Sequence, residues 1–226
     1  MMNKKAKEIG MKNTVFNNSH GLDEKTQNKS TAYDMALLSS YAYKNETYRK
    51  IVSTKKYNVQ TNKKSYSWTN RNKLLFSYKY TTGGKTGYTP SAGRTLVTNA
   101  SNNLNLTAVT LNDGNEYISH KKMYEYGFNN YKMYKILDKN KFKIDDAYYK
   151  DKIVIKKDFL YPLLDEEKDK IKVVVEIDKL ANYNDNDAVG KVIVKLDNEE
   201  IFKEKVYVNT NVNKKNIFEK IKDWFF

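Results

Sequence analysis

The residues with the clearest capacity for chemistry lie in the segment Thr81–Thr89, which reads Thr-Thr-Gly-Gly-Lys-Thr-Gly-Tyr-Thr. A phosphate-binding P-loop is one interpretation, because the segment contains Gly-Lys-Thr. That loop also requires a glycine five residues before its Gly-Lys-Thr and a helix after it. Lys79 stands five residues before Gly84, and the sequence that follows is strand-like. The segment therefore lacks two features of a P-loop.

The second interpretation is a Lys-Thr-Gly triplet on a strand that borders a binding site. The Lys85 ammonium and the Thr86 hydroxyl can hold a substrate carboxylate. Gly87 keeps the strand edge open, so that a substrate backbone can lie against it. The next N–H, that of Tyr88, can point at a developing oxyanion. This interpretation predicts a substrate with a carboxylate and an extended backbone.

Cysteine and histidine usage limits the remaining chemistry. The chain has no cysteine and two histidines. A cysteine nucleophile and a thiolate zinc site are thus excluded, and we expect neither a structural metal nor a cofactor. His20 is a candidate general base. His120 is expected on the exposed face of a helix, without a chemical role.

The elements that must position these residues begin at the N-terminus. Residues 1–10 read as the last turns of a helix that Gly10 closes, and they lack the apolar run of a secretory signal. Ser30 or Thr31 is placed to cap a helix with apolar spacing near 3.6 residues. Tyr57–Val59 reads as a short strand.

A hairpin and a covering helix are predicted after the triplet. Arg94–Ala100 and Leu104–Leu111 alternate in polarity, and a short turn joins them, which predicts an antiparallel hairpin. A helix over 116–131 follows. Three of its residues are expected to face inward: Met123, Tyr126 and Phe128. These signals predict an α+β fold, with an antiparallel sheet and covering helices.

The pattern of residues along the chain changes near Tyr134. From there to about Asn211 it reads as strands only, with candidates at 152–155, 170–177, 189–196 and 200–208. Several are β-branched runs, and the turns between them are rich in Asn, Asp and Gly. We therefore expect a small all-β second domain.

The last residues predict one more element. Five apolar side chains fall on one helical face: Ile217, Phe218, Ile221, Trp224 and Phe225. Lysines surround this face, so we expect an amphipathic helix at a membrane interface. The alternative is a terminal helix that packs on its own domain. No apolar run approaches the ~20 residues that a membrane-spanning helix needs.

The charge of the chain indicates an anionic partner. Its 226 residues include 41 Lys and Arg against 27 Asp and Glu, a formal net charge of +14. Nucleic acid, an acidic membrane surface and an acidic polymer all suit this balance. Lys dominates over Arg, which disfavours nucleic acid because Arg makes most bidentate contacts to bases and phosphates. An AT-rich genome would produce a similar bias without functional meaning.

Several motifs together point to a known family. They occur in the order Ala6–Thr14, His20–Asp23, Thr31–Ala36, Asn70–Leu75, Gly83–Thr89 and Ala92–Arg94. In these motifs, in the β-rich region and in the tail, the chain resembles the low-molecular-mass penicillin-binding proteins. These are serine-type D-alanyl-D-alanine carboxypeptidases of peptidase family S11. The resemblance implies a partial penicillin-binding, β-lactamase-like catalytic domain at 1–133, an all-β domain at 134–212 and an amphipathic membrane anchor at 213–226.

The resemblance also implies an activity and its partners. Such enzymes remove the terminal D-Ala from the pentapeptide stem of peptidoglycan through a serine acyl-enzyme, and β-lactams trap the same serine. By position, Lys85 and Thr86 would bind the terminal carboxylate, Gly87 would line the strand edge and the Tyr88 N–H would donate to the oxyanion. The loop that contains His20 and Asp23 would be structural and lie near the site.

The chain departs from the family where the nucleophile should be. The family's Ser-x-x-Lys and Ser-x-Asn motifs precede Lys-Thr-Gly, and neither occurs there. The strings at Ser53–Lys56, Ser119–Lys122 and Ser101–Asn103 are rejected, because their order or position is wrong. We therefore expect a C-terminal piece with no catalytic residue, inactive without an N-terminal half. The region Leu111–Gly114 also lacks the Arg that often helps to hold the carboxylate.

The resemblance to the family also implies a location, and two other functions are compatible with the sequence. The family works outside the cytoplasmic membrane, whereas a chain without a signal peptide would stay in the cytoplasm if made alone. The alternative function is a non-enzymatic module that binds the cell envelope or an anionic membrane surface. Nucleic-acid binding rests on charge alone, and we do not expect it.

Overall fold

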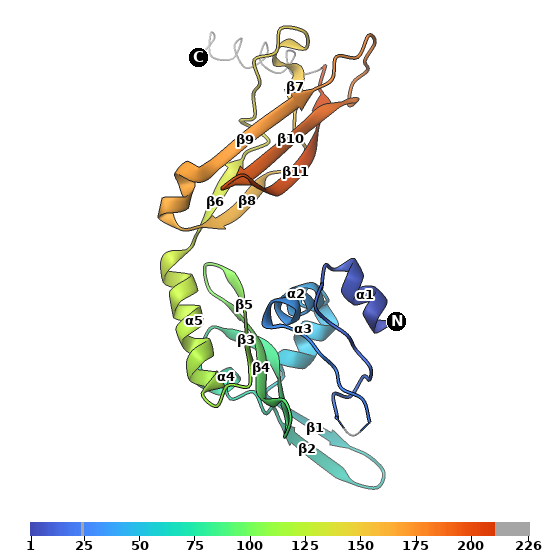
Figure 1. The fold of residues 1–226 in the computed structure, drawn as a ribbon, viewed down its shortest axis with the longest axis vertical. Helices are drawn as coiled ribbons and strands as arrows, with labels where there is room; N and C mark the ends of the chain where they lie inside the picture. Colours follow the sequence, from blue (N-terminus) through green and yellow to red (C-terminus); the bar gives the residue numbers. More distant parts are fainter. Residues whose placement is uncertain (24, 211–226) are drawn as a thin grey trace. The chain divides into compact units, whose positions relative to one another are not determined.

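The computed structural model describes residues 1–23 and 25–210. The chain forms two compact units, one over Met1–Asn130 and one that begins at Tyr131. This division lies a few residues before the boundary predicted after residue 133. Each unit is described by itself below, and both appear in Figure 1.

The first unit is built on a three-stranded antiparallel sheet in the order β3-β4-β5. Its strands are β3 (Thr81–Thr89), β4 (Gly93–Ser101) and β5 (Asn105–Leu111). Helices α2 (Ala32–Ala42) and α5 (Glu116–Asn130) pack against β4 and β5. The predicted hairpin is confirmed as β4 and β5, and the α+β prediction is confirmed with it.

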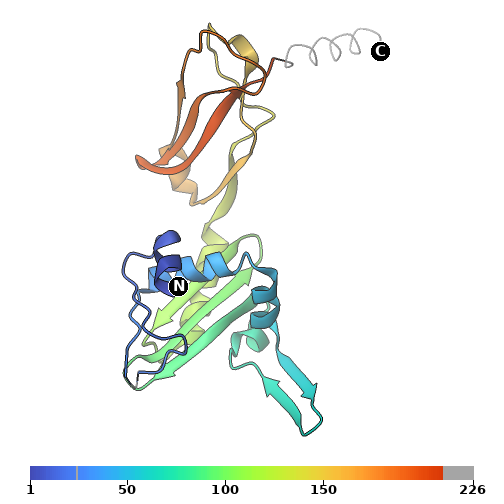
Figure 2. The same cartoon turned by 90° about the vertical axis from the view of Figure 1, so that its right-hand side faces the viewer.

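Two neighbouring residues of β4 show that the helices cover opposite faces of the sheet. The Ser39 hydroxyl of α2 donates to Asn99 Oδ1 at 3.1 Å. The Thr98 hydroxyl lies 2.6 Å from His120 Nδ1 of α5. Successive side chains of a strand point to opposite faces, so α2 and α5 enclose the sheet between them (Figure 2).

The helix end predicted at Gly10 and the helix cap predicted at Ser30 or Thr31 are both confirmed. Helix α1 (Met2–Glu8) ends just before Gly10, whose φ of 87° is the left-handed conformation typical of a helix terminus. Thr31 caps α2 by accepting the Asp34 N–H at 3.1 Å. Asp34 is 1% exposed and accepts from the Thr14 hydroxyl at 2.7 Å, which ties the N-terminal loop to α2.

Helix α5 turns a different face to the sheet from the one predicted. Met123 and Tyr126 are 40% and 57% exposed, so the prediction that both face inward is wrong, although Phe128 is buried. His120 is fully buried, and its prediction as an exposed residue is also wrong. The buried face is Glu116, His120, Tyr124, Gly127 and Phe128. A polar histidine is accommodated because Thr98 and Thr110 contact its two ring nitrogens.

Four further elements lie between α2 and β3 along the sequence. They are α3 (Glu46–Ser53), a hairpin of β1 (Lys56–Gln60) and β2 (Ser65–Thr69), and α4 (Leu74–Ser77). β1 confirms the short strand predicted at Tyr57–Val59. The hairpin projects from the unit in both views, whereas α3 and α4 pack against β3.

Among its described residues, 131–210, the second unit is all-β apart from two short 3₁₀ helices, η1 (Lys150–Lys152) and η2 (Asp165–Lys170). Its antiparallel sheet has the order β7-β11-β10-β9, and β6 pairs with β8. The bounds are β6 (Lys132–Leu137), β7 (Ile153–Val154), β8 (Phe159–Leu163), β9 (Ile171–Ile177), β10 (Ala188–Leu196) and β11 (Glu199–Val208). β-branched residues dominate the core: Leu137, Tyr149, Ile153, Ile155, Val189, Val192, Val194, Val206 and Val208. The predicted strands are confirmed here.

The membrane-anchor helix predicted at 213–226 lies outside the described residues. Within residues 1–23 and 25–210, no helix combines the length and the apolar character needed to cross a membrane.

Acid should weaken the first unit through His120. Burial lowers the pKa of His120 from 6.5 to about 4. The native state therefore resists protonation that the unfolded chain accepts below pH 6.5, so stability falls as the pH drops from 6.5 toward 4. We expect this group to account for a loss of about 2 to 3 kcal/mol in the free energy of unfolding.

Denaturant titrations at pH 7 and pH 4.5 measure this loss. Carboxylates contribute to the same interval, so the informative quantity is the difference between the wild type and His120→Gln, which should lose less stability on acidification. His20→Gln is the matched control, since His20 is exposed. An equal acid sensitivity in all three proteins would contradict a buried neutral His120.

Candidate functional site

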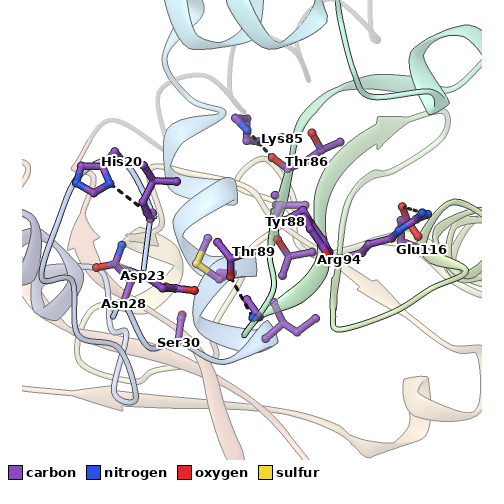
Figure 3. Close-up of a pocket in the computed structure, with 18 of the residues that line it drawn as sticks. His20, Asp23, Asn28, Ser30, Lys85, Thr86, Tyr88, Thr89, Arg94 and Glu116 are labelled. Carbon is purple, nitrogen blue, oxygen red and sulfur yellow. Dashed lines mark hydrogen bonds and ion pairs between the residues drawn. The ribbon is translucent and has the colours of Figure 1, made fainter. Parts of the chain in front are cut away.

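A cavity of about 1170 Å³ opens along the second half of β3, within the first unit (Figure 3). Its walls come from the loop after α1, the chain after β2, strands β3 and β4, and the start of α5. The residues that line it and carry the argument below are His20, Asp23, Arg71, Lys73, Lys85, Thr86, Gly87, Tyr88, Arg94, Thr95, Glu116 and Tyr117. Six site residues predicted from the sequence fall within the described part of the chain, and all six line this cavity: His20, Asp23, Lys85, Thr86, Gly87 and Tyr88.

Strand β3 forms one wall as an edge strand. It pairs with β4 on one side, with Lys85 opposite Val97 and Gly87 opposite Thr95. No other described strand pairs with its second side. An edge strand presents backbone donors and acceptors to which an extended peptide can add as a further strand. The predicted open edge is therefore present at the Lys-Thr-Gly triplet.

Two glycines allow β3 to lie this close to β4. A Cβ on Gly84 would stand 2.3 Å from the Val97 carbonyl oxygen, and the φ of Gly84 is +147°. A Cβ on Gly87 would stand 2.5 Å from Thr95 Oγ1. Close packing against β4 thus favours glycine at position 87. The sequence analysis gave a different reason for Gly87, the open strand edge.

The predicted carboxylate ligands follow each other on this strand. Lys85 is exposed, Thr86 is half-buried and the Lys85 ammonium donates to the Thr86 carbonyl oxygen. Tyr88 is 70% exposed and stands opposite Arg94 of β4. Lys85, Thr86 and Tyr88 therefore all line one cavity, and an ammonium, a hydroxyl and a backbone N–H are groups that can bind an anion.

The cavity is also lined by cations that the sequence analysis did not assign to the site. Arg71, Lys73 and Arg94 line the cavity with Lys85. Arg94 Nη1 lies 3.6 Å from Oε1 of the buried Glu116, which directs the guanidinium along the cavity wall. A concentration of positive charge in a cleft attracts an anionic substrate. The cavity therefore has two guanidinium groups, although the region Leu111–Gly114 contains no Arg.

The Asn70–Leu75 motif explains how two of these cations are positioned. Asn70 Nδ2 donates to the Thr54 carbonyl at 3.0 Å. Asn72 Oδ1 accepts the Leu74 N–H at 3.1 Å and so supports the start of α4. The asparagines are thus structural, and Arg71 between them lines the cavity. The motif itself was the signal that could have identified Arg71, as Ala92–Arg94 was for Arg94.

The loop that contains His20 and Asp23 forms the opposite wall (Figure 3). His20 Nδ1 accepts the Leu22 N–H at 3.0 Å. Asp23 accepts a hydrogen bond from the Ser91 hydroxyl in the β3–β4 turn, and this bond holds the pKa of the Asp23 carboxyl below its usual value. The loop is thereby tied across the cavity to the sheet.

The serine strings rejected in the sequence analysis lie elsewhere. Ser53 ends α3 and its hydroxyl donates to the Lys50 carbonyl at 3.2 Å. Ser119 is on α5 and Ser101 ends β4, and none of the three lines the cavity. Among the described residues, no group of three or more His, Cys, Asp or Glu side chains is arranged to hold a metal ion.

Comparison with known proteins identifies the family of the chain. Residues 1–115 match the family model of the D-alanyl-D-alanine carboxypeptidases, and residues 131–214 match that of the penicillin-binding protein 5 C-terminal domain. The first match covers half of the chain, so the chain belongs to the D-alanyl-D-alanine carboxypeptidase family, peptidase S11.

Individual relatives support the assignment. The chain is 34% identical to the D-alanyl-D-alanine carboxypeptidase DacA of Haemophilus influenzae, over 99% of this chain and 59% of the relative. The crystal structure of penicillin-binding protein 5 from the same organism superposes with a TM-score of 0.66 at 30% identity, covering 92% of this chain and 63% of that one. A point mutant of the Streptomyces K15 DD-transpeptidase superposes with a TM-score of 0.53 at 31% identity, covering 57% and 53%. The chain thus spans about three fifths of the length of its Haemophilus relative.

The contact between Gly87 and Thr95 generates a test of the site's packing. Gly87→Ala should lower the free energy of unfolding by about 1 kcal/mol or more, because the new methyl group meets Thr95 Oγ1. Thr95→Ala removes that oxygen, so the double variant should recover most of the loss. Chemical denaturation of all four proteins gives the coupling energy. Additive effects of the two changes would contradict this explanation of Gly87.

Proposed function

We propose that the first unit binds the terminal carboxylate of peptidoglycan pentapeptide stems, as the carboxylate-binding part of a serine-type D-alanyl-D-alanine carboxypeptidase. The complete enzyme removes the terminal D-Ala through a serine acyl-enzyme. One observation carries the proposal: Lys85 and Thr86 stand on an unpaired strand edge inside a cation-lined cavity. The family of the chain supports the reaction type.

Substrate binding would use the strand edge and the cations together. The stem's terminal residues would extend along β3, with their carboxylate between the Lys85 ammonium and the Thr86 hydroxyl. Charge-assisted hydrogen bonds of this kind are about twice as strong as neutral ones. The Tyr88 N–H would donate to the oxyanion as the scissile carbonyl is attacked. A β-lactam, which also carries a carboxylate, would occupy the same place.

The acylating serine would be supplied by residues that this sequence does not contain. Neither Ser-x-x-Lys string in the chain lines the cavity. Without those residues the chain would be inert.

The proposed place of action is the outer face of the cytoplasmic membrane, where peptidoglycan is built. The net charge of +14 suits an anionic membrane surface. The lysine-rich tail with Trp224 and Phe225 would serve as the anchor.

Exposure to a fluorescent penicillin tests the missing nucleophile. We expect no labelled band for this chain on a denaturing gel, because the residual site binds a carboxylate but cannot form an acyl-enzyme. A complete D-alanyl-D-alanine carboxypeptidase treated in parallel is the positive control. A covalently labelled chain would overturn the proposal that the serine lies outside this sequence.

Equilibrium binding of an N-acylated D-Ala-D-Ala peptide tests the carboxylate site. Lys85→Met should weaken binding about tenfold or more, since a hydrogen bond to a charged group contributes about 1.5 to 3 kcal/mol. Lys122→Met, an exposed lysine of α5 outside the cavity, is the matched control and should bind like the wild type. A peptide amidated at its C-terminus should bind the wild type as weakly as the free acid binds Lys85→Met. Equal affinity of the wild type and Lys85→Met for the free acid would refute the assignment.

A further inference from the structure

Opposite charges stand near the two ends of the β3 edge that lines the cavity. Lys85 and Thr89 are four residues apart on a regular stretch of β3, so their side chains share one face and their Cα atoms lie ~13 Å apart. Beyond Thr89, Asp23 of the facing loop accepts a hydrogen bond from the Ser91 hydroxyl in the β3–β4 turn. Lys85, Thr89 and Asp23 are labelled in Figure 3. The cavity therefore presents an ammonium toward one end of the edge and a carboxylate toward the other.

The Asp23 carboxylate is available to a ligand. Its hydrogen bond from Ser91 holds the pKa of the carboxyl below its usual value, so Asp23 is an anion at neutral pH. Among the described residues, that partner is a hydroxyl, and no lysine or arginine is paired with Asp23. Glu116, the other carboxylate that lines the cavity, is buried and lies 3.6 Å from Arg94. A cationic group of a ligand would therefore pair with Asp23 rather than with Glu116.

The spacing of the two charges matches the stem peptide. With the terminal carboxylate at Lys85 and the scissile carbonyl at the Tyr88 N–H, the stem runs toward Thr89. Its penultimate residue stands opposite Tyr88, so the side chain of the third residue from the end turns to the face that Lys85 and Thr89 share. The third residue is ~7 Å along the chain from the terminal one, and a four-carbon side chain adds ~6 Å. Its tip thus reaches the end of β3, where Asp23 lies.

We propose that Asp23 binds the side-chain amine of the diamino acid that is third from the end of the stem, and so selects stems in which this amine is free. This inference rests on the proposed function of the cavity. In a stem that is already cross-linked through its amine, the nitrogen is an uncharged amide and cannot form an ion pair with the carboxylate. Ser91 is a positioning residue, because its hydroxyl holds Asp23 against the end of β3.

The expected preference for a free amine is modest. Asp23 is accessible to solvent, and accessible ion pairs change an equilibrium constant only a few-fold. Lys29 also lines the cavity and would repel the amine. Lys85 is farther along the strand than the ~8 Å over which charges interact strongly at physiological ionic strength, so it does not cancel the attraction. We therefore expect stems with a free amine to bind about three- to fivefold more tightly.

Two peptides that differ at one nitrogen test the proposal. One is Nα-acetyl-L-Lys-D-Ala-D-Ala, which has a free side-chain amine, and the other is the same peptide with that amine acetylated. In calorimetric titrations the wild type should prefer the free amine about three- to fivefold, and the preference should shrink at about 1 M salt. Asp23→Asn should bind both peptides alike, and Ser91→Ala should lose part of the preference. Asp145→Asn, at an exposed carboxylate of the second unit, is the matched control and should keep it.

The outcomes separate this inference from the function on which it rests. Equal affinities of the wild type for the two peptides, with both weakened by Lys85→Met, would overturn the role of Asp23 and leave the carboxylate site intact. Equal binding of the acetylated peptide by the wild type and Lys85→Met would overturn the function of the cavity itself. A preference that survives Asp23→Asn would assign the amine to another group and so overturn the inference. Full preference in Ser91→Ala would remove the positioning role of Ser91.

Discussion

The close approach of β3 to β4 is the constraint on which the rest of the candidate site depends. Gly84 and Gly87 have no space for a side chain on the β4 side. Because β3 is fixed so closely on one side and pairs with no described strand on the other, the Lys-Thr-Gly triplet lies on a sheet edge that borders the cavity. Groups on strands are held more precisely than groups on loops, so the residues of β3 that line the cavity keep fixed positions relative to one another.

The sheet that carries this edge is held by polar contacts as well as apolar ones. Thr98 faces α5 and Asn99 faces α2, so adjacent residues of β4 fasten the two covering helices. A fully buried Tyr124 shares the Thr98 hydroxyl with His120. Such a network specifies one arrangement of the helices, because any displacement would leave buried polar groups unpaired. The loop that contains His20 and Asp23 is joined to the sheet by one hydrogen bond between exposed residues, from the Ser91 hydroxyl to Asp23.

Much of the fold could be predicted from local sequence signals, and the errors have physical causes. The capped start of α2, the β4–β5 hairpin and the β-branched strands of the second unit have periodicity or turn chemistry that does not depend on distant contacts. The orientation of α5 was predicted from hydrophobicity alone, which favoured Met123 and Tyr126 over His120. Thr98 and Thr110, distant in sequence, supply the partners that make a buried histidine acceptable. Pairwise contacts of this kind cannot be found from the periodicity of one segment.

The edge of β3 that no described strand pairs with has a thermodynamic consequence for the first unit. Backbone groups along an exposed strand edge keep hydrogen-bonding capacity, and an added strand can pair with them. A peptide that paired with this edge would therefore stabilise the native state by mass action, in proportion to the logarithm of its concentration. Folding of the unit and occupation of the edge would then be one linked equilibrium, in which the melting temperature reports how much of the edge is occupied.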